Sequence, residues 1–170
     1  LVVVLGLAIT LFLLMHFLTD VLLTHIITSP NIRAAAEEYM KFRHYGIIFV
    51  CFNFLYRALY VGISNTKVIT YSTIIMAVVN IVLDYGLIFG RFGLPEMGIG
   101  GAALASFAAE ISALVFFTTY SYIMLRKRDF GMFKIHKLES ELMGRILKIS
   151  TPTMIQKLFS FSVWFIFFVL

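Results

Sequence analysis

Residues 68–92 read VITYSTIIMAVVNIVLDYGLIFGRF, an apolar run long enough to cross a lipid bilayer. A helix rises about 1.5 Å per residue, so some 20 residues span a hydrocarbon core about 30 Å thick. The run contains an amide and a carboxylate, Asn80 and Asp84, and residues four apart lie on the same face of a helix. A carboxylate near the bilayer centre costs about 2.5–3.5 kcal/mol even on insertion scales. We therefore expect Asp84 to face a wet cavity or a bound ligand.

The composition of the whole chain is that of a membrane protein. Hydrophobic residues make up 61% of it and charged residues 14%, whereas soluble domains have about 45–50% and about 25%. The expected fold class is all-α, a polytopic membrane helical bundle. The single cysteine, Cys51, excludes a disulfide framework, and His16 is expected to pack or hydrogen-bond in the core. Both ends of the chain lie in apolar runs, so we expect it to be an internal piece of a longer protein, truncated at both ends.

Five membrane-spanning helices are predicted from the apolar runs and the breaks between them. They cover residues 1–28, 46–63, 68–92, 100–125 and 149–170. Residues 31–45 are polar but helical by propensity, and they form an exposed entry to the second span. Residues 64–67 form a tight connection, and residues 90–101 form a glycine-rich loop. The small residues at 100–105 are expected to allow close helix packing.

A basic segment indicates the orientation of the chain. Residues 126–148 carry seven Lys and Arg against three acidic residues, and their apolar positions recur at helical spacing. This pattern predicts an amphipathic helix, and Lys and Arg accumulate on the cytoplasmic side of membranes. The segment is therefore expected to be cytoplasmic, with residues 64–67 on the same side and residues 29–45 and 91–99 outside. Arg33, Lys41 and Arg43 oppose this orientation.

Three motifs carry a resemblance to a known family. They are RALYVGISNTK at 57–67, NIVLD at 80–84 and FGLPEMGIGGAALAS at 92–106. Their order and spacing resemble the multidrug and toxic compound extrusion (MATE) transporters, from the third to the seventh of about twelve helices. The glycine-rich third motif is the most specific of the three.

The resemblance implies a transporter made of two six-helix lobes that rock to give alternating access. Such proteins export cationic amphipathic compounds in exchange for Na⁺ or H⁺. Residues 1–125 would belong to the N-terminal lobe, residues 126–148 would be the cytoplasmic linker, and residues 149–170 would open the C-terminal lobe. We expect no enzyme activity, no cofactor beyond the coupling ion and no nucleic-acid partner. The expected state is a monomer in the cell inner or plasma membrane, with small cationic substrates.

The resemblance also implies a cation site formed by Asn80, Asp84 and Ser106, where Ser106 replaces a more usual Thr after a longer loop. Carboxylate and amide oxygens suit Na⁺ or a proton. An isolated buried carboxylate favours its protonated form and a bound cation favours the ionised form, so the two occupants exclude each other. Three alternatives stay open: Asp84 pairs with Arg91, Asn80 makes only an interhelical hydrogen bond, or Ser106 bonds to its own helix.

A second polar group is expected to line a substrate or proton cavity. Glu110 follows Ser106 by four residues and lies near the bilayer centre, where it would be a second proton site or a counter-charge for a cationic substrate. The alternative is an ion pair with Arg57, which also lies in an apolar run. By the resemblance, Asn53 and Tyr39 match polar residues of the family's fourth helix.

Two other functions remain open on the sequence alone. A lipid-linked saccharide flippase of the same superfamily shares the helix plan, and it would place basic residues such as Arg57 and Lys157 in its cavity. A membrane-embedded enzyme or scaffold of another class would need catalytic groups outside this chain, because no nucleophile–base pair or metal-ligand cluster is visible in it.

Overall fold

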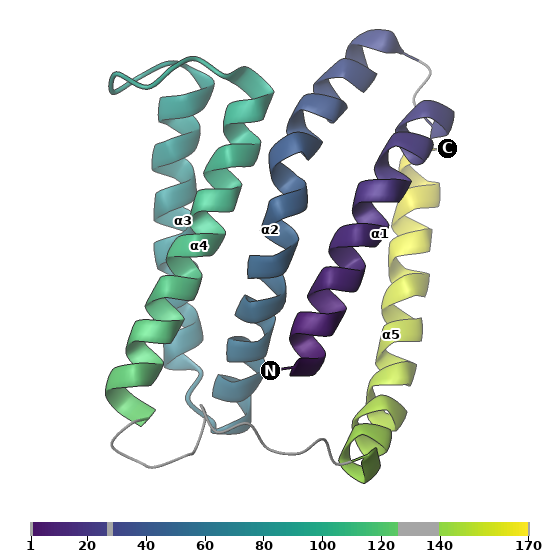
Figure 1. Cartoon of the computed structure of the whole chain (residues 1–170), viewed down its shortest axis with the longest axis vertical. Helices are drawn as coiled ribbons and strands as arrows, with labels where there is room; N and C mark the ends of the chain where they lie inside the picture. The colour runs from purple at the N-terminus through teal and green to yellow at the C-terminus, as the bar shows by residue number, and fades with distance from the viewer. Residues whose placement is uncertain (1, 27–28, 126–139, 170) are drawn as a thin grey trace. The chain divides into compact units, whose positions relative to one another are not determined.

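The computed structural model describes residues 2–26, 29–125 and 140–169, and within them the chain forms helices and no strand (Figure 1). The helices are α1 (Val2–Ile26), α2 (Pro30–Gly62), α3 (Lys67–Ile88), α4 (Gly98–Leu125) and α5 (Ser140–Val169). Four of these described helices, α1 to α4, are long and apolar enough to cross a membrane. The prediction of an all-α membrane helical bundle is confirmed.

The chain divides into two compact units, Leu1–Phe130 and Gly131–Leu170. In the first unit, α4 packs against both α2 and α3, whereas α2 and α3 barely touch, and α1 packs on α2 (Figure 1). The turn between α2 and α3 and the loop between α3 and α4 lie at opposite ends of this unit. Because α4 packs against both α2 and α3, a site that involves α4 is formed with one or both of these neighbours.

Two helix boundaries in the first unit differ from the sequence prediction by more than two residues. The polar segment 31–45 continues without a break into the apolar segment, so both belong to one helix of 33 residues. Pro30 occupies its first turn, where a missing N–H is tolerated. At the other boundary α3 ends at Ile88 rather than at Phe92. Gly90 and Phe92 both adopt positive φ, 63° and 58°, which a helix cannot continue.

A close approach of α3 and α4 depends on Gly101. A Cβ placed on this glycine would lie 2.7 Å from the backbone oxygen of Leu87 on α3. The same oxygen accepts a hydrogen bond from the Met97 N–H at 2.8 Å, just before α4 begins. Ala103 and Ala105, further along α4, are fully buried. These contacts agree with the predicted role of the small residues at 100–105.

An aromatic cluster closes the opposite end of the same interface. Tyr60 of α2 and Phe117 of α4 are fully buried together with Val68 of α3. The Tyr60 hydroxyl shares a 2.7 Å hydrogen bond with the Ser121 hydroxyl, and Tyr56 stacks on Phe117 with ring centroids 5.5 Å apart. This cluster connects the three helices that surround the polar site described below.

The second unit contains α5, which passes through Pro152 without interruption. The predicted amphipathic segment up to residue 148 and the apolar segment from 149 are therefore parts of one helix. Residues 126–139, the remainder of the predicted linker, lie outside the described residues. The fifth membrane span and the domain boundary at 148/149 stay predictions.

Candidate cation and substrate site

Asn80 of α3 and Ser106 of α4 meet at the interface of these two helices. The Asn80 amide Nδ2 donates a hydrogen bond to the Ser106 hydroxyl at 3.4 Å. The interhelical hydrogen bond expected as an alternative role for Asn80 is therefore present, and Ser106 is a partner across the interface. Both residues line a cavity of about 310 Å³, together with Arg43, Met76, Ala77, Ala109 and Glu110.

Asp84 lies one turn beyond Asn80 on α3 and is partly buried. Its Oδ1 atom is buried and has no hydrogen-bond partner. Three ion pairs occur among the described residues, and none of them joins Asp84 to Arg91, so this predicted alternative is absent. Asp84 does not line the 310 Å³ cavity. A buried carboxylate oxygen without a donor is costly, and a cation or a proton would satisfy it.

Glu110 is buried on α4 and pairs with a residue that the sequence did not predict. Its Oε1 accepts a hydrogen bond from Arg43 Nη1 of α2 at 2.6 Å. The predicted pairing of Glu110 with Arg57 is wrong, because Arg57 donates instead to the Thr73 hydroxyl at 3.3 Å. The absent side chain of Gly46 makes room for the carboxylate, since a Cβ there would lie 2.8 Å from Oε2.

Asn53 joins this group from α2. Its Nδ2 donates to the backbone oxygen of Glu110 at 3.0 Å, while its Oδ1 is buried without a partner. Asn53, Glu110, Arg43 and Arg57 line a cavity of about 260 Å³ with Val50, Phe54 and Met76. Tyr39, the remaining predicted cavity residue, is partly buried on α2 and lines neither of the two cavities.

A regular spacing on α2 could have revealed Arg43. Arg43, Gly46, Val50, Asn53 and Arg57 follow one another at intervals of three or four residues, so they share one helix face. From the sequence, Arg43 was predicted only to be a charge that affects orientation. A glycine next to a basic residue on the face that carries Asn53 was the available signal for a buried ion pair.

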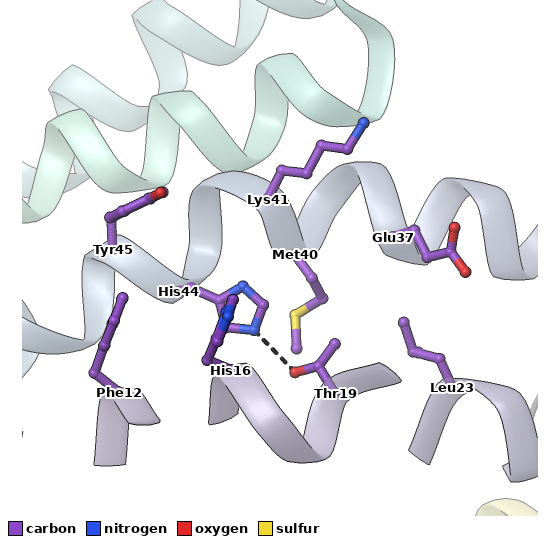
Figure 2. A pocket seen from close by; sticks show the side chains of 9 residues that line it. All are labelled: Phe12, His16, Thr19, Leu23, Glu37, Met40, Lys41, His44 and Tyr45. Carbon is purple, nitrogen blue, oxygen red and sulfur yellow. Dashed lines mark hydrogen bonds between the residues drawn. The ribbon is translucent and has the colours of Figure 1, made fainter. Parts of the chain in front are cut away.

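A larger pocket of about 560 Å³, which was not predicted from the sequence, lies between α1 and α2 (Figure 2). Figure 2 shows Thr19 of α1 and His44 of α2 joined by a hydrogen bond of 2.9 Å. His16, which was expected in the core, is exposed in the structure and packs edge-on against His44 at 6.0 Å. The other lining residues are Phe12, Leu23, Glu37, Met40, Lys41 and Tyr45.

The family model MatE matches residues 1–86, about half of the chain. This chain belongs to the MatE family. The resemblance found from the three sequence motifs is therefore confirmed. Four apolar helices together with this membership indicate a multi-pass membrane protein.

Several curated relatives resemble this MatE chain over most of its length. It is 27% identical to a probable multidrug resistance protein NorM of Agrobacterium fabrum over 80% of the chain, and 31% identical to a probable NorM of Thermotoga maritima over 85%. It is 29% identical to a probable multidrug resistance protein YoeA of Bacillus subtilis over 75%. The chain spans 30%, 31% and 28% of these three relatives. No solved structure matches it.

Proposed function

We propose that the protein is a secondary active exporter that exchanges Na⁺ or H⁺ for cationic amphipathic compounds. Membership of the MatE family and the names of the multidrug resistance relatives support export of drugs or toxins. The observation that carries the ion-coupled mechanism is the buried, unpartnered Oδ1 of Asp84, one turn from the Asn80–Ser106 hydrogen bond. Such an oxygen lacks a donor and is available to a cation.

The coupling cation would bind Asp84 together with oxygen atoms of Asn80 and Ser106. Carboxylate, amide and hydroxyl oxygens are hard ligands that suit Na⁺. A proton on Asp84 would remove the negative charge that Na⁺ needs, so the two ions would compete. Asn80 and Asp84 belong to α3 and Ser106 to α4. Occupation of the site would therefore change the contact between these helices.

This change would drive export only if it altered the free energies of the inward-open and outward-open states by different amounts. A ligand shifts a conformational equilibrium by its differential affinity for the states. The 260 Å³ and 310 Å³ cavities lie along α4 within a few turns of the coupling site, and both contain Glu110. In this proposal the Glu110 carboxylate attracts the cationic substrate, and rearrangement of the α3–α4 interface changes its affinity.

The proposed orientation places residues 126–148 in the cytoplasm and the α3–α4 loop outside, in a cell inner or plasma membrane. Two of the three basic residues that oppose it have acidic partners. Arg33 pairs with Glu37 at 2.8 Å, and Arg43 pairs with Glu110 at 2.6 Å. The proposal follows the larger count, since residues 126–148 carry seven Lys and Arg against these three. We propose that the complete protein acts as a monomer.

The test is ethidium efflux from proteoliposomes that contain the full-length protein and carry an imposed Na⁺ or H⁺ gradient. Asp84→Asn should insert normally but lose efflux that depends on the gradient, because the neutral amide has no negative charge to hold Na⁺ and takes up no proton. Glu96→Gln removes an exposed carboxylate from the α3–α4 loop and should retain efflux. Wild-type efflux by Asp84→Asn would remove Asp84 from the mechanism. Movement of a polyprenyl-linked sugar instead of ethidium would favour a flippase.

A further inference from the structure

The two oxygens of Glu110 have different surroundings. Oε1 accepts the 2.6 Å hydrogen bond from Arg43, while Oε2 is buried and has no partner. Asn53 Oδ1 is a second buried acceptor without a donor, and only 7–8% of Asn53 and Glu110 is exposed. Both residues line the 260 Å³ cavity. Two residues that line one cavity thus each carry an acceptor without a donor, and rotation of either side chain would turn that acceptor to a ligand in the cavity. Such a ligand would be positively charged and carry N–H donors.

Arg43 is held less firmly than the carboxylate it pairs with. Its side chain is 35% exposed, against 11% for that of Glu110, and only one of the five guanidinium N–H groups is known to bond the carboxylate. Arg43 lines both cavities together with Glu110 and Met76. The ion pair thus lies between the cavity that contains Asn53 and the cavity that contains Asn80. A long side chain with free space on both sides can leave the carboxylate without moving α2.

We propose that Glu110 and Asn53 form a second cation site, and that Arg43 is a tethered cation that occupies it until an external organic cation displaces it. The ligand class is an organic cation with N–H groups, such as a guanidinium or a protonated amine, because a guanidinium already fits the carboxylate. Exchange of one cation for another keeps the buried carboxylate paired. Removal of the partner without replacement would instead leave a buried charge uncompensated.

The site deepens the proposed function but is separable from it. Asp84, Asn80 and Ser106 hold the coupling ion in that proposal, whereas Glu110 and Asn53 hold the organic cation. Binding at equilibrium needs no ion gradient, although its affinity depends on the access state that the Asp84 site favours. Asp84→Asn should therefore still bind the organic cation, with a shifted Kd, while it loses gradient-driven efflux. Retained binding with lost efflux would support both proposals, and lost binding in Glu110→Gln with intact Asp84 concerns the second site alone.

The experiment measures binding of methylguanidinium to the full-length protein in detergent by isothermal titration calorimetry. If Arg43 occupies the carboxylate nine-tenths of the time, only about one-tenth of the sites are free to bind a ligand. Removal of Arg43 frees all of them and lowers the apparent Kd by about tenfold, because the apparent affinity scales with the free fraction. We expect this shift in Arg43→Gln. The double variant Arg43→Gln with Glu110→Gln should lose the binding.

Arg57→Gln is the matched control, because Arg57 lines the same cavity but bonds to Thr73 rather than to Glu110. It removes the same charge without vacating the carboxylate, and it should shift the Kd clearly less than Arg43→Gln does, because salt screens its charge at the binding site. Equal shifts in Arg43→Gln and Arg57→Gln would overturn the displacement proposal. Retained binding in the double variant would place the cation elsewhere and would also overturn it.

Arg43→Lys tests the same proposal where Arg43→Gln fails to fold. Lysine keeps the positive charge, so the buried carboxylate remains compensated, but it lacks the planar fork of the guanidinium. A weaker tethered competitor should give methylguanidinium binding tighter than in the wild type. A Kd equal to or weaker than that of the wild type would contradict displacement.

Discussion

Gly101→Ala should separate α3 from α4. The added Cβ would lie 2.7 Å from the Leu87 backbone oxygen and 2.8 Å from the Leu87 carbonyl carbon, where ordinary contact begins at 3.4 Å. The backbone must therefore move by about 0.7 Å, the difference between 3.4 and 2.7 Å. Overpacking of this kind costs about 1–3 kcal/mol. The Asn80–Ser106 hydrogen bond, already long at 3.4 Å, crosses the same interface and should weaken further.

The assay is thermal unfolding of the full-length protein in detergent, combined with gradient-driven ethidium efflux. Gly6→Ala is the matched control, because a Cβ on this α1 glycine meets nothing within 4 Å. Alanine is favoured over glycine inside a helix, so this control should be neutral or stabilising by up to about 1 kcal/mol. Equal unfolding temperatures for Gly101→Ala and Gly6→Ala would refute the claim that the glycine sets the helix spacing.

Two further predictions concern stability. Gly46→Ala should destabilise the protein by about 1 kcal/mol, less than Gly101→Ala, because its Cβ would meet the movable carboxylate of Glu110 rather than backbone. The reverse order in thermal unfolding would contradict this. Tyr60→Phe should cost about 0.6–1.7 kcal/mol by breaking the buried hydrogen bond to Ser121. A double-mutant cycle with Ser121→Ala checks it, and additive losses would show that the two hydroxyls do not interact.

Much of the fold could be predicted from the sequence because membranes impose simple length and hydropathy rules. Each apolar run of about 20 residues predicted one helix, and α1 to α4 lie where these runs are. The end of α3 was placed four residues too late, since hydropathy does not detect the positive φ values at Gly90 and Phe92. The polar segment 31–45 is half of α2, because helical backbone bonding does not require an apolar sequence.

The polar residues of the site could be predicted from the sequence, but most of their interaction partners could not. Asn80 and Asp84 lie on one helix face by spacing alone, but the meeting of Asn80 with Ser106 was suggested only by the family resemblance. Glu110 was recognised as costly, and its partner was misassigned to Arg57. That choice depends on how α4 is placed and rotated against α2, which spacing within one helix does not determine. Gly46 allows the pairing with Arg43, because its missing side chain leaves room for the Glu110 carboxylate.

The most direct test of cation coupling at Asp84 uses a gradient of ethidium to drive the movement of the coupling ion. Proteoliposomes of the full-length protein receive an ethidium gradient and no ion gradient, and the movement of ²²Na⁺ and of protons is followed. Our proposal predicts that one of these ions flows against ethidium in the wild type and that this flow disappears in Asp84→Asn. Ion flow of unchanged size in Asp84→Asn would contradict it.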